Sequence, residues 1–411
     1  MEGKELYSIK TKDLSLNISN TEIESVRNRS IEKTGLRIYK DGYIGVSGSI
    51  GKYNEADLEK KAIDNLKLCI PYNNDITADS SEKLILDDEI IDSNKFVDSI
   101  AEILSCLKNE EREFSFFNKA RLVEKEVSLR NDNNLELLYK CRYVSLSLII
   151  KEKNSPNIMD ASFGYEGWDF DKQKIIDEIK EICRSYKTPV DLSENKRSLV
   201  VFTTGDYLPF LKFITELDGR KYGTNSSFFS GKIGQKLFSD NFSFYYSRNK
   251  ADVFSPFFDA EGVVNADHRF PLIENGILKA PYTDKKISTQ YNLPHTGSAS
   301  SEHDSVPMPG FIGSYIKESG KDIVDLLSGE RAIFVVISSG GDFTPGGDFG
   351  APVQFGLLFD GKNFIGKLPT LQISSNIYDM FGNSYRGVSR DRAFELSNDK
   401  YIVMEMKVSK I

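Results

Sequence analysis

The feature that most constrains this fold is the uneven distribution of two hydrophobic periodicities along the chain. Apolar residues recur at helical spacing in three segments that all lie before Tyr186. After Ser239 that spacing almost disappears, and short apolar runs around Asn-Gly or Asp-Gly pairs replace it. The first pattern predicts amphipathic helices and the second predicts β-hairpins. The sequence therefore predicts an α+β protein whose two parts differ in architecture.

The first part, residues 1–190, is predicted to pack its helices on an antiparallel sheet. Residues 5–52 have the pattern of strands, with a hairpin around Asp41-Gly42. Alternating apolar residues between Arg121 and Lys151 predict two further strands. Residues 71–81 are polar and are expected to form a loop. Helices are expected after three residues that can cap a helix N-terminus: Asn54, Asp92 and Asp171.

The second part, residues 197–411, is predicted to consist mostly of antiparallel strands. A buried strand at 198–203 is followed by apolar residues at helical spacing, which predict a short helix that ends at Gly219. The glycine-rich segment 340–350 lacks the Lys-Ser/Thr pair of a P-loop, so turns and close backbone packing are favoured over phosphate binding. Residues 188–196 contain Pro189 and several charges and are predicted to link the two parts.

The composition argues against several classes of function. A net charge of −8 and a pI near 5.3 argue against direct binding of nucleic acid. We expect neither a signal peptide nor a membrane span, because no basic segment precedes an apolar one and no apolar run reaches about 18 residues. Four widely spaced cysteines favour reduced, mostly buried thiols in a cytoplasmic protein: Cys69, Cys106, Cys141 and Cys183.

Several phrases, taken in order, resemble the TldD/PmbA family, also called modulators of DNA gyrase. They include Phe229-Ser-Gly-Lys-Ile-Gly234, Phe257-Phe-Asp-Ala-Glu-Gly-Val263 and the hairpin 272–279. The resemblance extends from about Gly35 to Asp391. It implies that the second part is a metalloprotease-like domain of that family.

The family's zinc motif has no counterpart in this chain. In TldD-type members the helix after the buried strand carries His-Glu-x-x-x-His, but Phe210 to Thr215 here read Phe-Leu-Lys-Phe-Ile-Thr. TldD-type members also use a cysteine near the C-terminus, whereas the last cysteine here is Cys183. The resemblance therefore implies a PmbA/TldE-type subunit without catalytic, cofactor-binding or metal residues of its own. Zinc is expected in a TldD-like partner.

An alternative is a stand-alone metallohydrolase with a relocated metal site near His268, His295 and His303. These are the three histidines of the chain, and none forms a helical pair that could present two imidazoles to one metal. Loop histidines at the surface are therefore favoured. Glu261 could act as an acid, but only beside a group that shifts its pKa. Ser298 and Ser300 lie close to His295 in sequence, without the G-x-S-x-G pattern of a nucleophile elbow.

The first hypothesis also specifies partners. The resemblance implies that a TldD-like catalytic subunit cleaves small or unfolded peptides, in proteolysis and peptide maturation. We expect a homodimer in isolation, formed through the second part, and a heterodimer when the catalytic subunit is present. Strand edges in the second part could hold a peptide or unfolded-protein substrate by β-augmentation. Direct contacts with nucleic acid or membrane are not expected.

Overall fold

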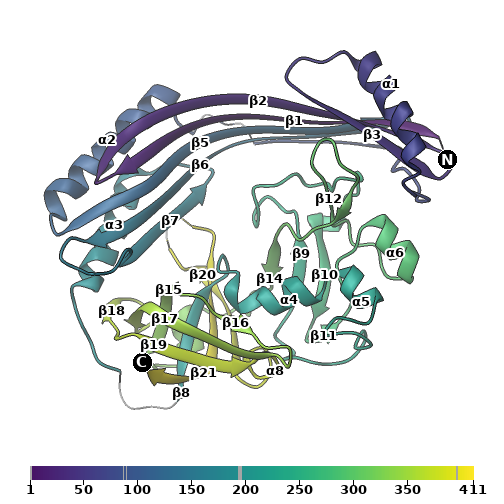
Figure 1. Ribbon diagram of the computed structural model, residues 1–411. Helices are drawn as coiled ribbons and strands as arrows, with labels where there is room; N and C mark the ends of the chain where they lie inside the picture. Colours follow the sequence, from purple (N-terminus) through teal and green to yellow (C-terminus); the bar gives the residue numbers. More distant parts are fainter. Residues whose placement is uncertain (1, 87, 89, 193–196, 395–396) are drawn as a thin grey trace.

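The computed structural model describes residues 2–86, 88, 90–192, 197–394 and 397–411. It shows an α+β protein in which antiparallel strand pairs predominate, as predicted. One long, curved sheet crosses the molecule, and the second part of the chain lies on its concave side (Figure 1). Within the described residues, no helix has both the length and the apolar character needed to cross a membrane.

The long sheet belongs to the first part of the chain. Its strand order is β3-β2-β1-β5-β6-β4, and β7 pairs with the half of β6 that β4 leaves free. β4 pairs in parallel with β6 and was not predicted, because this short edge strand is only half-buried. The strands are β1 (Gly3–Ser19), β2 (Glu22–Lys40), β3 (Tyr43–Ile50), β4 (Ser80–Leu86), β5 (Phe114–Asn131), β6 (Leu135–Glu152) and β7 (Ala161–Gly167).

The helices of the first part begin where the sequence predicts. Asn54, Asp92 and Asp171 each accept two backbone N–H groups of the following first turn, which stabilises the helix start. The predicted turn at Asp41-Gly42 joins β2 to β3, and both of its residues have positive φ. The helices are α1 (Glu55–Asn65), η1 (Leu66–Leu68), α2 (Ser93–Glu110) and α3 (Lys172–Tyr186).

The second part contains a sheet that closes on itself through the pairs β15–β8, β8–β21, β21–β19, β19–β17 and β17–β15. Its pairs are antiparallel except β8–β15. The strands are β8 (Arg197–Thr203), β9 (Phe244–Ser247), β10 (Arg269–Glu274), β11 (Ile277–Leu278), β12 (Ala299–Ser300), β13 (Met308–Pro309), β14 (Ser314–Ile316), β15 (Ala332–Ser338), β16 (Asp342–Phe343), β17 (Asp348–Phe359), β18 (Phe364–Lys367), β19 (Leu371–Asn376), β20 (Tyr385–Arg392) and β21 (Lys400–Lys410).

Helices of the second part are short, as expected. The predicted helix after β8 is divided into two elements, η2 and α4. Gly219 does not end this helix as predicted, because Asp218 caps a further helix, α5, that begins at Gly219. The helices are η2 (Leu208–Phe210), α4 (Leu211–Glu216), α5 (Gly219–Gly223), η3 (Ala266–His268), α6 (Lys285–Tyr291), α7 (Ile323–Leu327) and α8 (Ile377–Met380).

The two faces of the long sheet contact different neighbours. Side chains alternate along a strand, so even-numbered residues of β1 such as Leu6 and Leu16 pack on the outer side with residues of α1 and α2. Odd-numbered Tyr7 instead faces Phe257 and Phe258 of the second part. A second apolar contact joins α2 and α3 to strands β8 and β15. The sheet therefore meets the second part at two places, and a hollow remains between them.

Candidate functional site

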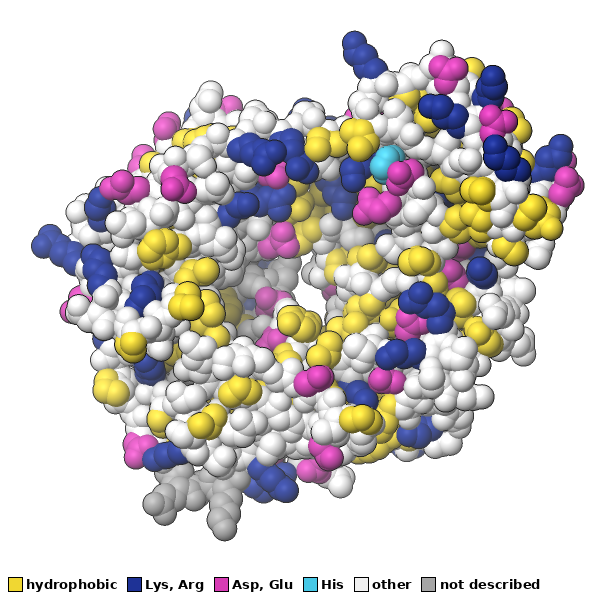
Figure 2. Space-filling model, in the orientation of Figure 1, with side chains coloured by type: hydrophobic (Ala, Val, Ile, Leu, Met, Phe, Trp, Pro, Cys, Tyr) yellow, Lys and Arg dark blue, Asp and Glu magenta, His cyan; other side chains and the backbone are white. Residues whose placement is uncertain are grey.

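The hollow between the two parts of the chain is lined by side chains of both parts. It has a volume of about 940 Å3 and is open to solvent through the middle of the molecule (Figure 2). Strands β6 and β7 form its upper wall. Residues 250–255, β14 and the segment 397–400 form the opposite wall. A space of this size is within the range of ligand-binding cavities.

Two strand edges border the hollow. Within the described residues, β7 pairs with β6 alone and β14 pairs with β9 alone. Gly164 and Glu166 of β7 and Ser314 and Tyr315 of β14 belong to the lining. An unpaired edge presents backbone N–H and C=O groups that can bind an extended peptide as an added strand. The geometry therefore suits a peptide backbone better than a compact small molecule.

An aromatic wall lies beside the β7 edge. The ring centroids of Trp168 and Phe254 are 4.4 Å apart, and those of Tyr143 and Phe254 are 4.8 Å apart. Trp168 is the single tryptophan of the chain and lines the hollow. Its fluorescence can therefore report what enters this space. Such a wall offers apolar contact area for a peptide side chain.

Charged groups in the hollow differ in how well they are paired. Arg269 donates to both carboxylate oxygens of Asp252, at 2.8 and 3.0 Å, and lies over the ring of Tyr315. Glu166, by contrast, makes no hydrogen bond or ion pair with any described residue. Burial raises the pKa of Glu166, although the nearby Arg121 opposes the shift. Glu166 is thus available to a ligand that carries a donor.

Residues 210–215, where the resemblance would place the zinc motif, include Phe210 and Phe213 of an apolar core. Phe210 is 1% exposed, and its ring stacks on Phe244 with centroids 5.6 Å apart. Thr215 donates its hydroxyl to the carbonyl of Leu211, and the Lys212 amine donates to the Thr344 carbonyl. Zinc needs imidazole, thiolate or carboxylate ligands, and residues 210–215 offer none of these groups. These residues therefore do not fit a zinc ion.

The glycine-rich segment 340–350 packs against α4, the helix that contains Lys212. It forms the turn between β16 and β17, where Gly347 has a φ of 88° that favours glycine. The carbonyls of Thr344 and Pro345 accept hydrogen bonds from buried Lys212. Because these carbonyls bind a lysine of the chain itself, the segment 340–350 has the predicted role in turns and backbone packing.

The three histidines lie in different surroundings and do not form one cluster. His268 lies 3.2 Å from Glu82, and its ring packs on Phe257. His303 is buried, so the surface position expected for it was wrong, and its Nδ1 lies 3.4 Å from an oxygen of Asp304. Of the three, His295 alone belongs to a group of potential metal ligands among the described residues. A site built from all three histidines is therefore not formed.

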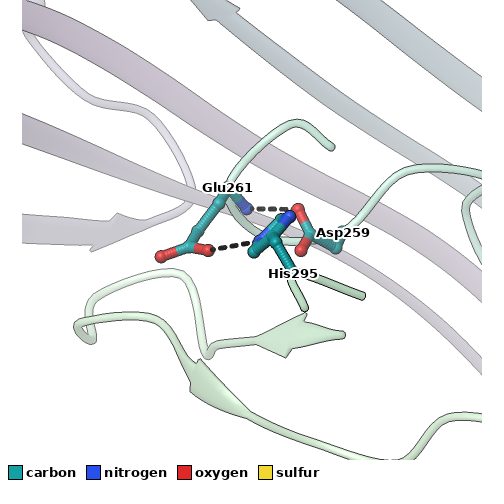
Figure 3. Close-up of side chains that lie close together, drawn as sticks. All are labelled: Asp259, Glu261 and His295. Atoms are coloured by element: carbon teal, nitrogen blue, oxygen red, sulfur yellow. Dashed lines mark hydrogen bonds and ion pairs between the residues drawn. The ribbon is translucent and has the colours of Figure 1, made fainter. Parts of the chain in front are cut away.

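His295 lies beside two carboxylates that are 36 and 34 residues earlier in the chain (Figure 3). Its Nε2 is 3.8 Å from Glu261 Oε2, and one donor atom from each of His295, Glu261 and Asp259 lies within 4.8 Å of the others. The Asp259 carboxylate already accepts the N–H groups of Glu261, Val263 and Ala299. These hydrogen bonds shape the turn and leave few lone pairs for an ion.

Glu261 fastens this turn to the first part of the chain. Its carboxylate accepts the Tyr72 hydroxyl at 2.8 Å and the Lys285 N–H at 2.9 Å. Burial alone would raise the pKa of Glu261, but the nearby His295 ring and the hydrogen bonds from Lys285 and Tyr72 hold it below its ordinary value. Burial and the Glu261 charge raise the pKa of Asp259. We interpret this group as a structural contact between the two parts.

Several of these relations were not visible in the sequence. Asp259 was not singled out, although the Asp-x-Glu spacing with Glu261 could have drawn attention to it. Ser298 is fully buried and donates its hydroxyl to the Thr283 carbonyl, whereas Ser300 is half-buried. All four cysteines are free thiols, but only Cys141 and Cys183 are buried, whereas most of the four were expected to be.

Comparisons with known proteins agree with this architecture. The structure of TldE from Thermococcus kodakarensis is similar, with a TM-score of 0.80 and 18% identity over 99% of this chain and 96% of that one. A candidate modulator of DNA gyrase from Thermotoga maritima has a TM-score of 0.78 and 15% identity over 99% and 96%. An uncharacterized protein of Methanocaldococcus jannaschii is 23% identical, over 92% of this chain and 89% of its own length.

The fold is thus that of an α+β protein similar to the solved TldE and gyrase-modulator structures. The C-terminal domain of the PmbA/TldA metallopeptidases matches residues 198–411, and domain 1 of the same family matches residues 5–67. The chain belongs to the PmbA/TldD family.

Proposed function

We propose that this chain is a TldE-like subunit that holds an extended peptide in the hollow, while a TldD-like partner supplies the zinc and the cleavage chemistry. The observation that carries the proposal is the hollow of about 940 Å3 bordered by the free edges of β7 and β14. Residues 210–215 contain no zinc ligand and so could not hold a zinc-activated water. This supports the assignment of peptide binding to this chain and of cleavage to the partner.

The proposed assembly is a homodimer in isolation and a heterodimer with the catalytic subunit in the cytoplasm. Similar folds in the two subunits would allow one contact to serve both assemblies. Within such a heterodimer this chain would enclose the peptide and increase its residence time near the partner's zinc. Neither peptide binding nor positioning requires a metal in this chain.

A direct test of peptide binding uses the fluorescence of Trp168. Unfolded peptide should change its intensity or wavelength in a saturable manner. Gly164→Leu should weaken this binding at least about tenfold, because the new side chain would project into the hollow and block the β7 edge. Gly164 suits this substitution because an added Cβ meets no atom within 4 Å. Ser30→Leu, at an exposed position on the outer side of β2, is the matched control.

The subunit role is tested with the catalytic partner. A TldD-like protein of the same genome should co-purify with this chain, and peptide cleavage should require both proteins. The Gly164→Leu variant should still co-purify but should lower the cleavage rate. Equal cleavage without this chain, together with separate elution, would reject the subunit role. About one zinc per purified chain, lost on His295→Ala, would instead favour the stand-alone hydrolase.

A further inference from the structure

A strip of basic residues lies on the concave side of the long sheet, next to the hollow. It consists of Arg27 and Arg29 on β2 and Lys119 and Arg121 on β5, and we call it the basic strip. Together with Asp13 and Ser15 of β1, these residues surround a depression of about 270 Å3. Lys and Arg side chains gather where the sheet passes above the hollow (Figure 2).

The strand register explains why these residues share one face. Ser15 pairs with Arg27 on one side and with Arg121 on the other, and Asp13 pairs with Arg29. Directly paired residues of neighbouring strands point to the same face. Asp13 and Ser15 have the parity of Tyr7, which contacts the second part of the chain. The basic strip therefore faces the concave side, away from α1 and α2.

The same register joins the basic strip to the hollow. Arg121 pairs with Ser145, and Lys119 pairs with Ser147. Both serines line the hollow. A polypeptide that leaves the hollow across the sheet would therefore pass directly over the basic strip, without a gap between the two surfaces.

The charges of the strip are poorly neutralised by the chain. Asp13 accepts two hydrogen bonds from Arg121, at 2.8 and 3.1 Å. Within the described residues, Arg27, Arg29 and Lys119 form no hydrogen bond or ion pair through their side chains, and all three are exposed. Among the described residues, Asp13 is thus the one carboxylate that bonds to these four cations, and Glu166 of the hollow acts on Arg121 without forming an ion pair, in a protein whose net charge is −8. Grouped like charges repel one another, and an anionic partner would relieve that repulsion.

We infer that the basic strip binds the acidic part of an extended polypeptide whose neighbouring residues occupy the hollow. This inference rests on the proposed peptide-binding role and adds the charge of the substrate. A polypeptide fits better than nucleic acid, because the strip continues into a hollow bordered by strand edges and an aromatic wall. Carboxylates that point from one face of the peptide would meet guanidinium groups, which bind them in a bidentate manner.

The test measures fluorescence anisotropy of labelled peptides of about ten residues, a length that spans about 33 Å when extended. One peptide alternates Glu with Gly and Ser, and two others carry Gln or Lys in place of Glu. The full-length protein should bind the Glu peptide at least about tenfold more tightly than the Gln peptide. A rise in salt from about 50 to about 500 mM should remove this preference.

The variant Arg27→Gln/Arg29→Gln should lose the preference for Glu, whereas its affinity for the Gln peptide should not change. Lys60→Gln/Lys61→Gln, an equal charge change at exposed positions of α1, is the control and should keep the preference. Thermal unfolding of both variants establishes that they are folded. Lys119→Gln provides an independent single substitution with the same expected direction.

Each other outcome has a defined meaning. Equal binding of the Glu and Gln peptides would overturn the role of the basic strip and leave the proposed peptide binding intact. Failure of all three peptides to bind would reject both proposals. Tighter binding of a single-stranded oligonucleotide of about ten nucleotides than of the Glu peptide would overturn the inference in favour of nucleic acid.

Discussion

Two polar regions lie on the same face of strands β1 and β2 and differ in whether their charged side chains are paired. In the first, which we call the polar junction, Glu5, Arg37 and Glu261 are buried where the sheet meets the second part. Arg37 donates to Glu5 at 2.8 Å, to the Ala260 carbonyl at 2.5 Å and to the Ser301 hydroxyl at 2.6 Å. In the second, the basic strip, three of four cations lack any partner in the described chain.

The difference separates a structural role from a binding role. A buried charge must be paired, because its desolvation costs several kcal/mol. The polar junction therefore contributes to the fixed arrangement of the two parts. An exposed charge without a partner contributes little to stability, so the basic strip can change without loss of the fold. Substitutions in the two regions should accordingly affect different measurements.

The largest effect is expected for Arg37→Met in the polar junction. The change leaves Glu5 buried without its cation and should lower the free energy of unfolding by about 3–5 kcal/mol. Urea denaturation measures this loss. Arg130→Met is the control, because Arg130 is 61% exposed and its ion pair with Glu55 lies at the surface. A loss below about 1 kcal/mol for Arg37→Met would contradict the structural role of the junction.

A smaller loss is expected for Glu261→Gln. The Tyr72 hydroxyl and the Lys285 N–H bond to different carboxylate oxygens, and an amide has only one acceptor oxygen, so one of these donors would lose its partner, which should cost about 1–3 kcal/mol at pH 7. The pKa of Glu261 is lowered in the folded protein, so its carboxylate stabilises the fold above the unfolded pKa of about 4.3 and loses this contribution as pH falls. The two proteins should therefore converge in stability in acid. A difference that persists there would point to lost packing.

The substitution Asp284→Asn should have the opposite sign. Burial raises the pKa of Asp284 to about 6, so at pH 7 the folded protein bears the cost of a buried charge. Asparagine can still accept the Ile287 N–H that caps α6, and we expect a gain of about 1–2 kcal/mol at pH 7. The gain should decrease as pH falls through 6 and disappear below the unfolded pKa of about 3.9. Thermal unfolding at a series of pH values measures this profile.

The smallest effect on stability is expected in the basic strip. Arg27→Gln/Arg29→Gln should change the free energy of unfolding by less than about 0.5 kcal/mol, with a slight gain at low salt because repulsion between the cations decreases. Urea denaturation at low and high salt measures the difference. A loss above about 2 kcal/mol would mean that these arginines hold the fold and would remove the contrast between the two regions.

Local signals in the sequence predicted much of the fold. Three helix starts follow from side chains that bond to N–H groups two or three residues later, at Asn54, Asp92 and Asp171. The hairpins at Asp41-Gly42 and Asn275-Gly276 follow from residues that tolerate positive φ. These signals act over a few residues. The prediction at Gly219 was wrong. This glycine was expected to end the helix before it, but Asp218 caps a second helix that begins at Gly219.

The sequence by itself determined the helices, the hairpins and the absence of histidine from residues 210–215. Only the tertiary structure decided which polar residues meet. Arg27 and Arg121 are separated by 94 positions, and the antiparallel register places both beside Ser15. The contact between Asp259 and His295 likewise depends on how the second part folds around β12. Such contacts depend on strand register and packing across the whole chain, which no short stretch of sequence encodes.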